Sequence, residues 1–228
     1  MIYSHLSNRA VVWKMDALEW LKGLASASVD LVITDPPYPS LDHHRSYGTT
    51  TRLKDWFPTV PNEYIAEAIG ELYRVLKKDS HAYIMADAAT IQWLLVSRAF
   101  EPFTLHKWLT WNKVRRGMGY NYAGQCEYIL YLKKGKRKLN TRKHTDLITA
   151  SAMTKRSKAW TYPSQKPSAV FEPLIENSSD VGEIVCDPFF GSGVVADVAV
   201  KMGRRFIGCD SEQRAHDALT ARLSALDF

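Results

Sequence analysis

Asp35-Pro36-Pro37-Tyr38 follows a mostly apolar run, Val29 to Thr34, and combines residue types that could help an aromatic amine to react. Such a nitrogen is a poor nucleophile because its lone pair is delocalised into the ring. Asp35 and the backbone carbonyl of Pro36 could each accept one N–H and return that lone pair to the nitrogen. The prolines end a central strand, and Tyr38 offers a face on which a flipped base can stack. We interpret these four residues as a catalytic motif for methylating a base; the alternative is an ordinary turn.

A second motif, Asp187-Pro188-Phe189-Phe190-Gly191-Ser192-Gly193, follows a predicted buried strand and opens a predicted helix. Glycines at such a place let a ligand approach the backbone closely. Gly191 to Ala196 also satisfies G-x-G-x-x-A, and Asp210 lies ~17 residues beyond Gly193, near the position of a ribose-binding acid in dinucleotide sites. The motif alone therefore leaves open a nicotinamide cofactor, a nucleoside sulfonium, or a turn without a ligand. The candidate cofactor-binding residues here are Asp187, Phe189, Phe190, Gly191, Ser192, Gly193 and Asp210.

Two further places could complete a nucleoside site. Asp16, followed by Ala17, ends a predicted strand, where its carboxylate could accept the adenine amino group of a cofactor or cap the next helix. Asp210 has the same two interpretations, with ribose hydroxyls as the donors. Gln165-Lys166-Pro167 precedes a predicted helix, whose free N–H groups suit a carboxylate such as a methionine tail. An ordinary polar loop with proline in the first turn is the alternative.

Basic residues mark two candidate surfaces for nucleic acid. The chain has 30 Lys and Arg against 24 Asp and Glu, a net charge of +6 and a pI near 9.1. The segment Lys133 to Lys158 holds ten Lys or Arg and one acid, Asp146. Such side chains bind phosphates, although a solvated loop is the alternative for both surfaces. The predicted DNA-binding residues are His43, His44, Arg45, Arg52, Lys54, Lys136, Arg137, Lys138, Arg142 and Lys143.

Length and composition narrow the class of protein. The 228 residues, 46% of them hydrophobic, suit one α/β core. Three scattered cysteines argue against a disulfide framework or zinc site, and Asp42-His43-His44 has no partner at metal-ligand spacing, so no metal is predicted. No apolar run approaches the roughly 18 residues that span a bilayer, and Met1 to Arg9 has no signal-peptide core. We therefore expect a soluble, cytoplasmic protein.

Apolar clusters and breakers alternate in a strand–helix rhythm, which predicts a mostly parallel sheet covered by helices. The predicted strands are Val11–Met15, Val29–Thr34, His81–Ala86, Leu105–Trp111, Glu127–Leu132, Glu183–Cys186 and Arg205–Cys209. The predicted helices are a short one through Leu18, Leu21 and Leu24, then Pro61–Leu76, Thr90–Phe100, Pro167–Ile175, Val194–Met202 and Glu212–Leu223. The polar stretch from Pro39 to Pro58 is a long loop, of a kind that is usually functional or disordered.

The two motifs and their order resemble the β class of DNA amino-methyltransferases. In that class D-P-P-Y comes first, a basic variable region follows, and F-x-G-x-G, here Phe189 to Gly193, comes last. Trp111-Asn112-Lys113 and Glu127 to Leu130 are similar to the strands that follow the catalytic motif. The resemblance, from Asp16 to about Asp210, implies a class I S-adenosylmethionine-dependent fold: a mostly parallel seven-stranded sheet with helices on both faces. It also implies one domain, 1–228, with a basic DNA-recognition insertion at about 133–163.

The resemblance implies that the cofactor-binding residues named above surround S-adenosylmethionine and that Asp35, Pro36 and Tyr38 hold the target base. The predicted reaction is methylation of adenine N6 in double-stranded DNA, with cytosine N4 as the alternative. No Pro-Cys dipeptide is present, as methylation of cytosine C5 would require. A nicotinamide oxidoreductase would leave D-P-P-Y unexplained, and a non-catalytic binder would not need both motifs; a protein- or RNA-modifying relative stays open. The short variable region implies a brief target or a homodimer. The expected setting is a bacterial or phage protein at the nucleoid, with no nuclease partner specified.

Overall fold

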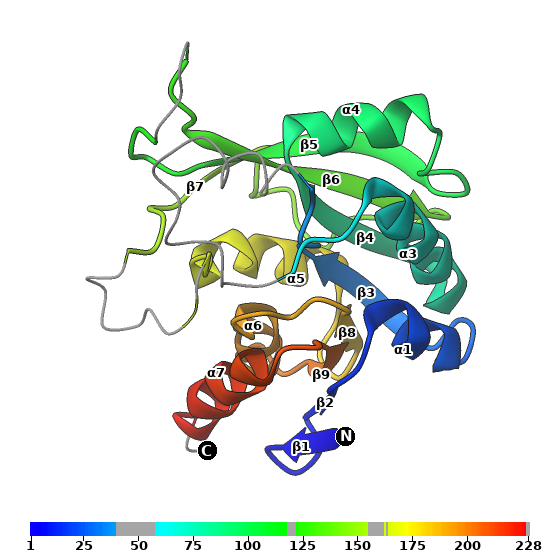
Figure 1. Ribbon diagram of the computed structural model, residues 1–228, viewed down its shortest axis with the longest axis vertical. Coiled ribbons are helices and arrows are strands. Elements are labelled where there is room, and N and C mark those ends of the chain that lie inside the picture. The colour runs from blue at the N-terminus through cyan, green and yellow to red at the C-terminus, as the bar shows by residue number, and fades with distance from the viewer. Residues whose placement is uncertain (40–57, 118–121, 155–161, 163, 227–228) are drawn as a thin grey trace.

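The structure is a computed structural model that describes residues 1–39, 58–117, 122–154, 162 and 164–226. Within these residues nine strands form one sheet in the order β1-β2-β9-β8-β3-β4-β6-β5-β7 (Figure 1). The strands are β1 Ile2–His5, β2 Ala10–Trp13, β3 Val29–Thr34, β4 Leu76–Ala86, β5 Thr104–Asn112, β6 Cys126–Lys134, β7 Leu147–Thr149, β8 Ile184–Asp187 and β9 Arg205–Cys209. Strands β2, β9, β8, β3 and β4 run parallel, while β6 is antiparallel to both β4 and β5.

Helices cover both faces of this sheet (Figure 1). On one face lie α1 Ala17–Gly23, α3 Asn62–Val75 and α4 Ala88–Val96; on the other lie the 3-10 helix η2 Ser168–Val170, α5 Glu172–Ser178, α6 Val194–Lys201 and α7 Gln213–Ser224. Successive residues of a strand point to opposite faces. In β4, Tyr83 and Met85 accordingly pack with the second set of helices, and Ala82 and Ile84 with the first. The predicted α/β fold, mostly parallel with helices on both faces, is confirmed.

The sheet has two more strands than the seven that the resemblance implies, one at each edge. Strand β1 pairs antiparallel with β2, and β7 pairs parallel with β5. Both are short, and neither contains a repeating apolar pattern that would mark it as a strand in the sequence. They are strands because a neighbouring strand offers them hydrogen bonds, which is a tertiary effect that sequence periodicity does not register.

Most predicted elements lie within two residues of the observed bounds, and three differ by more. The predicted helix Pro167–Ile175 is a 3-10 turn followed by α5, because Pro173 lacks an N–H and starts a new helix in its first turn. Helix α4 begins at Ala88, where the Asp87 side chain caps it, and ends at Val96 instead of Phe100. Strand β4 begins at Leu76 instead of His81, so that α3 runs directly into it.

The parallel strands bring acidic residues together at their carboxyl ends. Asp35 follows β3, Asp187 ends the neighbouring β8, and Asp210 follows β9. Asp16 follows β2 at the same edge. In open α/β sheets, ligands bind beyond the carboxyl ends of the strands, where the strand order reverses. The order β9-β8-β3-β4 places that reversal between β8 and β3, so the site is expected there.

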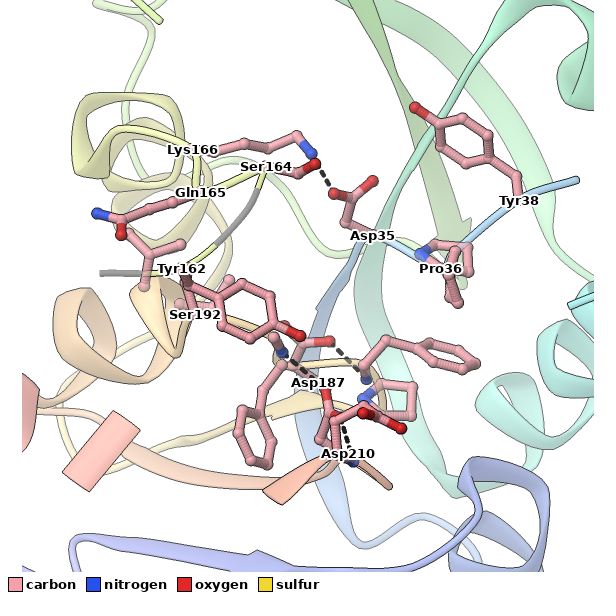
Figure 2. Close-up of a pocket in the computed structure, with 18 of the residues that line it drawn as sticks. Asp35, Pro36, Tyr38, Tyr162, Ser164, Gln165, Lys166, Asp187, Ser192 and Asp210 are labelled. Carbon is pink, nitrogen blue, oxygen red and sulfur yellow. Dashed lines mark hydrogen bonds and ion pairs between the residues drawn. The ribbon is translucent and has the colours of Figure 1, made fainter. Parts of the chain in front are cut away.

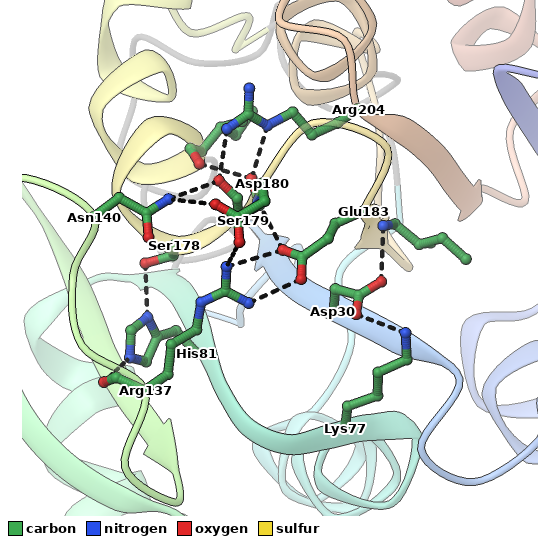
Figure 3. A network of polar contacts seen from close by, with 12 residues as sticks. Asp30, Lys77, His81, Arg137, Asn140, Ser178, Ser179, Asp180, Glu183 and Arg204 are labelled. Carbon is green, nitrogen blue, oxygen red and sulfur yellow. Dashed lines mark hydrogen bonds and ion pairs between the residues drawn. The ribbon is translucent and has the colours of Figure 1, made fainter.

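At the amino-terminal ends of the parallel strands, opposite these acids, a network of polar contacts joins the connecting segments (Figure 3). The Arg137 guanidinium donates to Glu183 Oε1 at 3.1 Å and to Asp180 Oδ2 at 3.0 Å. Arg204 donates to the carbonyl of Ser179 at 2.6 Å. His81 Nε2 contacts the carbonyl of Arg137 at 3.1 Å, and burial lowers the pKa of His81 to about 4, so that this ring is neutral at pH 7. The network ties the segment after β6 to the loop before β8.

No helix within the described ranges is long and apolar enough to cross a membrane. The same ranges contain no group of three or more His, Cys, Asp or Glu that could hold a metal ion. Of the cysteines, Cys186 and Cys209 are buried in the core and Cys126 is exposed.

The network predicts that Arg137 stabilises the fold. Replacing Arg137 by Ala leaves Glu183, whose side chain is 24% exposed, without its cation, and we expect the free energy of unfolding to fall. The expected loss is about 1–2 kcal/mol, whereas Lys138→Ala, at an exposed neighbouring position, should change it by less than ~0.5 kcal/mol. Urea denaturation followed by circular dichroism measures both values. Equal stabilities of the two variants would contradict the structural role.

Candidate active site

A cavity of about 490 Å³ opens beyond the carboxyl ends of the central parallel strands (Figure 2). Every predicted catalytic or cofactor-binding residue except Pro167 and Gly193 lines it. The predicted residues that line it are Asp16, Ala17, Asp35, Pro36, Pro37, Tyr38, Gln165, Lys166, Asp187, Phe189, Phe190, Gly191, Ser192 and Asp210. Motifs from both ends of the chain therefore meet at one place.

Asp35 lies where β3 ends, and its carboxylate forms an ion pair with Lys166 (Figure 2). The ammonium of Lys166 also lies 3.7 Å from Glu127 Oε2. Burial raises the pKa of Asp35 above its usual value, Lys166 opposes that rise, and Glu127 adds to it. Burial and the charge of Asp35 also raise the pKa of Tyr38, so its hydroxyl stays protonated at neutral pH.

Backbone hydrogen bonds hold the catalytic motif in a tight turn. The N–H of Tyr38 donates to the carbonyl of Pro36 at 2.9 Å, and the N–H of Val60 donates to the carbonyl of Pro37 at 2.8 Å. A carbonyl oxygen has two lone pairs, so Pro36 can accept one further N–H. The turn predicted as the alternative interpretation is thus present, and it is compatible with the predicted role of Pro36 as an acceptor.

Asp187 and Asp210 line the other end of the cavity, each held by neutral donors (Figure 2). Asp187 accepts the hydroxyl of Thr34 at 2.7 Å and the N–H of Phe189 at 3.0 Å. Asp210 accepts the N–H groups of Gly191 and Glu212, both at 2.9 Å. Burial raises the pKa of Asp187 to about 7 and that of Asp210 to about 6. Both carboxyls therefore titrate close to neutral pH.

The two glycines of the second motif have different roles. Gly191 lines the cavity with φ +47°, a left-handed conformation that favours glycine. Gly193, with φ +70°, lies behind the cavity, where a Cβ would come within 2.4 Å of Leu219 Cδ1. Gly193 allows α6 to begin against α7, and its neighbours line the cavity, so its place in the cofactor-binding set stays a prediction.

Asp16 caps α1 and lines the cavity at the same time. Its Oδ1 accepts the N–H groups of Leu18 at 2.9 Å and Glu19 at 3.1 Å, and its Oδ2 accepts the hydroxyl of Tyr64 at 2.7 Å. Tyr64 belongs to α3 and also lines the cavity. The two predicted roles of Asp16 thus fit the same geometry.

Several cavity residues were not predicted from the sequence, among them Tyr64, Tyr162, Lys113, Glu127 and Phe171. Their positions depend on how α3, β5 and β6 pack beside β3, which no local pattern encodes. One signal in the sequence could have identified Glu127: it is an acid directly before five apolar or aromatic residues of a strand, where a charge needs a partner.

Those predicted DNA-binding residues that the structure describes do not line the cavity. His43, His44, Arg45, Arg52 and Lys54 lie outside the described residues. Lys136, Arg137 and Lys138 come directly after Lys134, which pairs with Ser80 of β4. The cavity lies at the other end of β4, beyond Ala86. The six residues from Ser80 to Ala86 correspond to roughly 20 Å. Lys143 pairs with Glu176 of α5 at 2.5 Å, and the exposed Arg142 is its neighbour. The predicted insertion thus begins at the edge opposite the cavity, because β6 runs antiparallel.

Other basic residues do lie beside the cavity, in the connection between β5 and β6. Lys113 lines the cavity, and Arg115 and Arg116 follow it at exposed positions. The N–H of Gly117 donates to the carbonyl of Gly124 at 2.9 Å and holds the two arms of this connection together. Tyr122 is 95% exposed on the returning arm. We call residues 113–117 and 122–125 the rim segment.

The chain belongs to the N6/N4 DNA methylase family, whose model matches residues 29–221. The DNA adenine methyltransferase YhdJ of Escherichia coli is 27% identical over 86% of this chain and 76% of its own length. Two solved structures have the same fold over nearly the whole chain. M1.HpyAVI in complex with SAM matches with a TM-score of 0.68, 24% identity and coverage of 92% of this chain and 98% of its own. The cytosine-N4-specific PvuII DNA methyltransferase matches with a TM-score of 0.70, 14% identity and coverage of 98% and 97%.

Family membership confirms the predicted cofactor class, S-adenosylmethionine, over a nicotinamide dinucleotide. The side chains of the cavity fit such a group. Asp16, Asp187 and Asp210 form an acidic wall, which suits a ligand that carries a positive sulfonium, ribose hydroxyls and an amino group.

The raised pKa values of Asp187 and Asp210 predict how affinity for S-adenosylmethionine varies with pH. The positive charge and the hydroxyl donors of the ligand favour the ionised carboxyls. Affinity should therefore be full only above pH ~8 and fall as the pH drops through the values near 7 and 6. We expect a Kd at least ~10-fold higher at pH 5.5 than at pH 7.5 by calorimetry. Asp210→Asn should flatten this dependence; an unchanged Kd in the native protein would contradict it.

Proposed function

We propose that this protein methylates the N6 amino group of adenine in double-stranded DNA, with S-adenosylmethionine as methyl donor. The observation that carries the proposal is the position of Asp35 and the Pro36 carbonyl at the edge of the cavity whose other end is lined by Asp187 and Asp210. Two acceptors for one amine thus share a cavity with an acidic wall suited to a sulfonium nucleoside. Family membership supports DNA as the substrate.

The chain's own groups would prepare the amine. Asp35 and the Pro36 carbonyl each accept one N–H, which draws the nitrogen toward tetrahedral geometry and withdraws its lone pair from conjugation with the ring. The negative charge of Asp35 also stabilises the positive charge that develops on nitrogen, a role in which preorganised electrostatics contributes most. Tyr38 gives the extruded base a ring to stack on. When bound, the cofactor supplies an electrophilic methyl group.

Adenine is the proposed base, although the amino groups of adenine and cytosine present the same pair of N–H donors to Asp35 and the Pro36 carbonyl. D-P-P-Y leans toward adenine in the family that the sequence resembles, and YhdJ, a relative across most of the chain, is named an adenine methyltransferase. The likeness to the cytosine-specific PvuII enzyme, at 14% identity, concerns the fold. Cytosine N4 is therefore the alternative outcome of the experiment below.

We also propose that DNA contacts the rim segment instead of Lys136, Arg137 and Lys138. A base that enters the cavity brings its flanking phosphates to the cavity edge, where Arg115 and Arg116 are exposed. The exposed ring of Tyr122 lies on the same segment and could contact bases or sugars. Phosphate contacts of this kind position the duplex.

The reaction is tested by identifying its product. Duplex DNA incubated with the protein and labelled S-adenosylmethionine is digested to nucleosides and analysed by mass spectrometry; we expect N6-methyldeoxyadenosine. Asp35→Ala and Asp35→Asn should lower the single-turnover rate at least ~10²-fold, because each removes the charge beside the amine. Their affinity for the cofactor should change little, since its proposed contacts lie elsewhere. N4-methylcytosine as product would replace the base assignment, and near-normal turnover by Asp35→Ala would refute the mechanism.

The DNA surface is tested with two matched pairs of charge deletions. Changing both Arg115 and Arg116 to Gln should weaken DNA binding and reduce the slope of log K against log salt by up to ~1.8, because each lost phosphate contact removes about 0.9. Changing both Lys136 and Lys138 to Gln removes the same charge at the opposite edge and should leave the slope unchanged. Fluorescence anisotropy across a salt series measures both. A reduced slope for the Lys136 and Lys138 variant, with an unchanged slope for the Arg115 and Arg116 variant, would show that DNA contacts the basic segment instead.

A further inference from the structure

We propose that Lys166 is a positioning residue for the catalytic carboxylate, and that Lys166 and Glu127 together set the orientation and charge of Asp35. This inference rests on the proposed role of Asp35 and gives Lys166 a function other than holding the methionine tail of the cofactor.

Four side chains of alternating charge follow one another along the cavity wall. They come from four separate places in the chain: Asp35 after β3, Lys166 before η2, Glu127 in β6 and Lys113 after β5. The ammonium of Lys166 pairs with Oδ2 of Asp35 and lies 3.7 Å from Oε2 of Glu127. The ammonium of Lys113 lies 3.3 Å from Oε1 of the same glutamate. Figure 2 shows the amino end of Lys166 directed at Asp35 and away from Asp187 and Asp210.

Burial makes these contacts obligatory for Lys166. Its side chain is 9% exposed, and an ammonium so far removed from water is costly unless carboxylates surround it. Two carboxylates do so here, those of Asp35 and Glu127. Because Lys166 engages Oδ2 of Asp35, the carboxylate is held in one orientation and Oδ1 is left to accept an N–H from the substrate. A tail carboxylate would have to compete with both acids for the same ammonium.

The charges around Asp35 act in opposite directions. Among the described residues, the titratable groups that act on it from the neighbouring elements are those of Lys166, Glu127, Tyr38 and Asp187. Burial and Glu127 raise the pKa of Asp35, whereas Lys166 lowers it. Burial disfavours the charged form of Lys166, but Asp35 and Glu127 outweigh this and raise the pKa of Lys166 above its usual value. Lys166 therefore stays charged throughout the range in which Asp35 titrates.

Opposite pH shifts in two variants test this arrangement. Asp35 must be ionised to accept an N–H, so the single-turnover rate falls as the pH drops through its pKa. Lys166→Met removes the charge that lowers this pKa and should move the acid limb of the pH–rate profile up by about one unit or more. Glu127→Gln removes a charge that raises it and should move the limb down. Lys166→Arg keeps the charge and should leave the limb within ~0.3 unit of the native position.

Calorimetry with S-adenosylmethionine at pH 8 separates the two roles of Lys166. A positioning residue predicts a Kd within ~3-fold of the native value for Lys166→Met, which corresponds to less than 1 kcal/mol. A Kd raised more than ~10-fold with an unmoved acid limb would show that Lys166 holds the cofactor and would overturn the inference. Shifts of the two variants in the same direction would also overturn it. If Lys166→Met does not fold, the acid limbs of the pH–rate profiles of Glu127→Gln and Lys166→Arg decide the question.

The outcome for Asp35→Ala distinguishes this inference from the proposed function. An inactive Asp35→Ala together with unmoved limbs in the Lys166 and Glu127 variants refutes only the positioning role. Near-normal turnover of Asp35→Ala refutes the proposed mechanism itself.

Discussion

Parallel strands that end at one edge of the sheet bring four aspartates into a partly buried cavity, and this is the constraint on which the site depends. Each carboxylate needs partners there, because buried charge without them is costly. Asp16, Asp187 and Asp210 are held by neutral N–H and O–H donors, whereas Asp35 is paired with a cation. The difference separates two functions. Carboxyls held by neutral donors can respond to a positive ligand, whereas Lys166 favours the charged form of Asp35, which the proposed mechanism requires.

The sequence predicted the central sheet and most of the cavity because both depend on local patterns. Apolar runs that end at Asp35 and Asp187 predicted strands and also fixed which edge these acids occupy. The same reasoning could not place the basic segment relative to the cavity. Counting lysines and arginines says nothing about direction, and the antiparallel path of β6 carries Lys136 to Lys138 to the edge opposite the cavity. Exposed basic residues after β5, which are fewer, were overlooked for the same reason.

Alternatives that the sequence left open proved compatible in the structure. Asp16 is a helix cap and a cavity residue, because one carboxylate has several lone pairs and can serve backbone donors on one side and a ligand on the other. Lys166 shows the limit of motif reasoning. Its place before a helix predicted contact with the carboxylate tail of a cofactor. In the structure its ammonium pairs with Asp35, the residue after β3, which lies 131 residues earlier in the chain. No sequence pattern encodes that contact.

The two strands that the sequence did not predict determine how the sheet ends. Strand β1 has four residues, so the edge that it forms offers few free N–H and C=O groups to another strand. Strand β7 has three residues and pairs only with the last three residues of β5, Thr110 to Asn112. Among the described residues, the earlier part of β5 has no neighbouring strand on that side. Long, flat edges invite pairing with a second chain, and short ones discourage it. Addition of a strand from a second copy is therefore disfavoured at β1, and the uncovered part of β5 is the longer template.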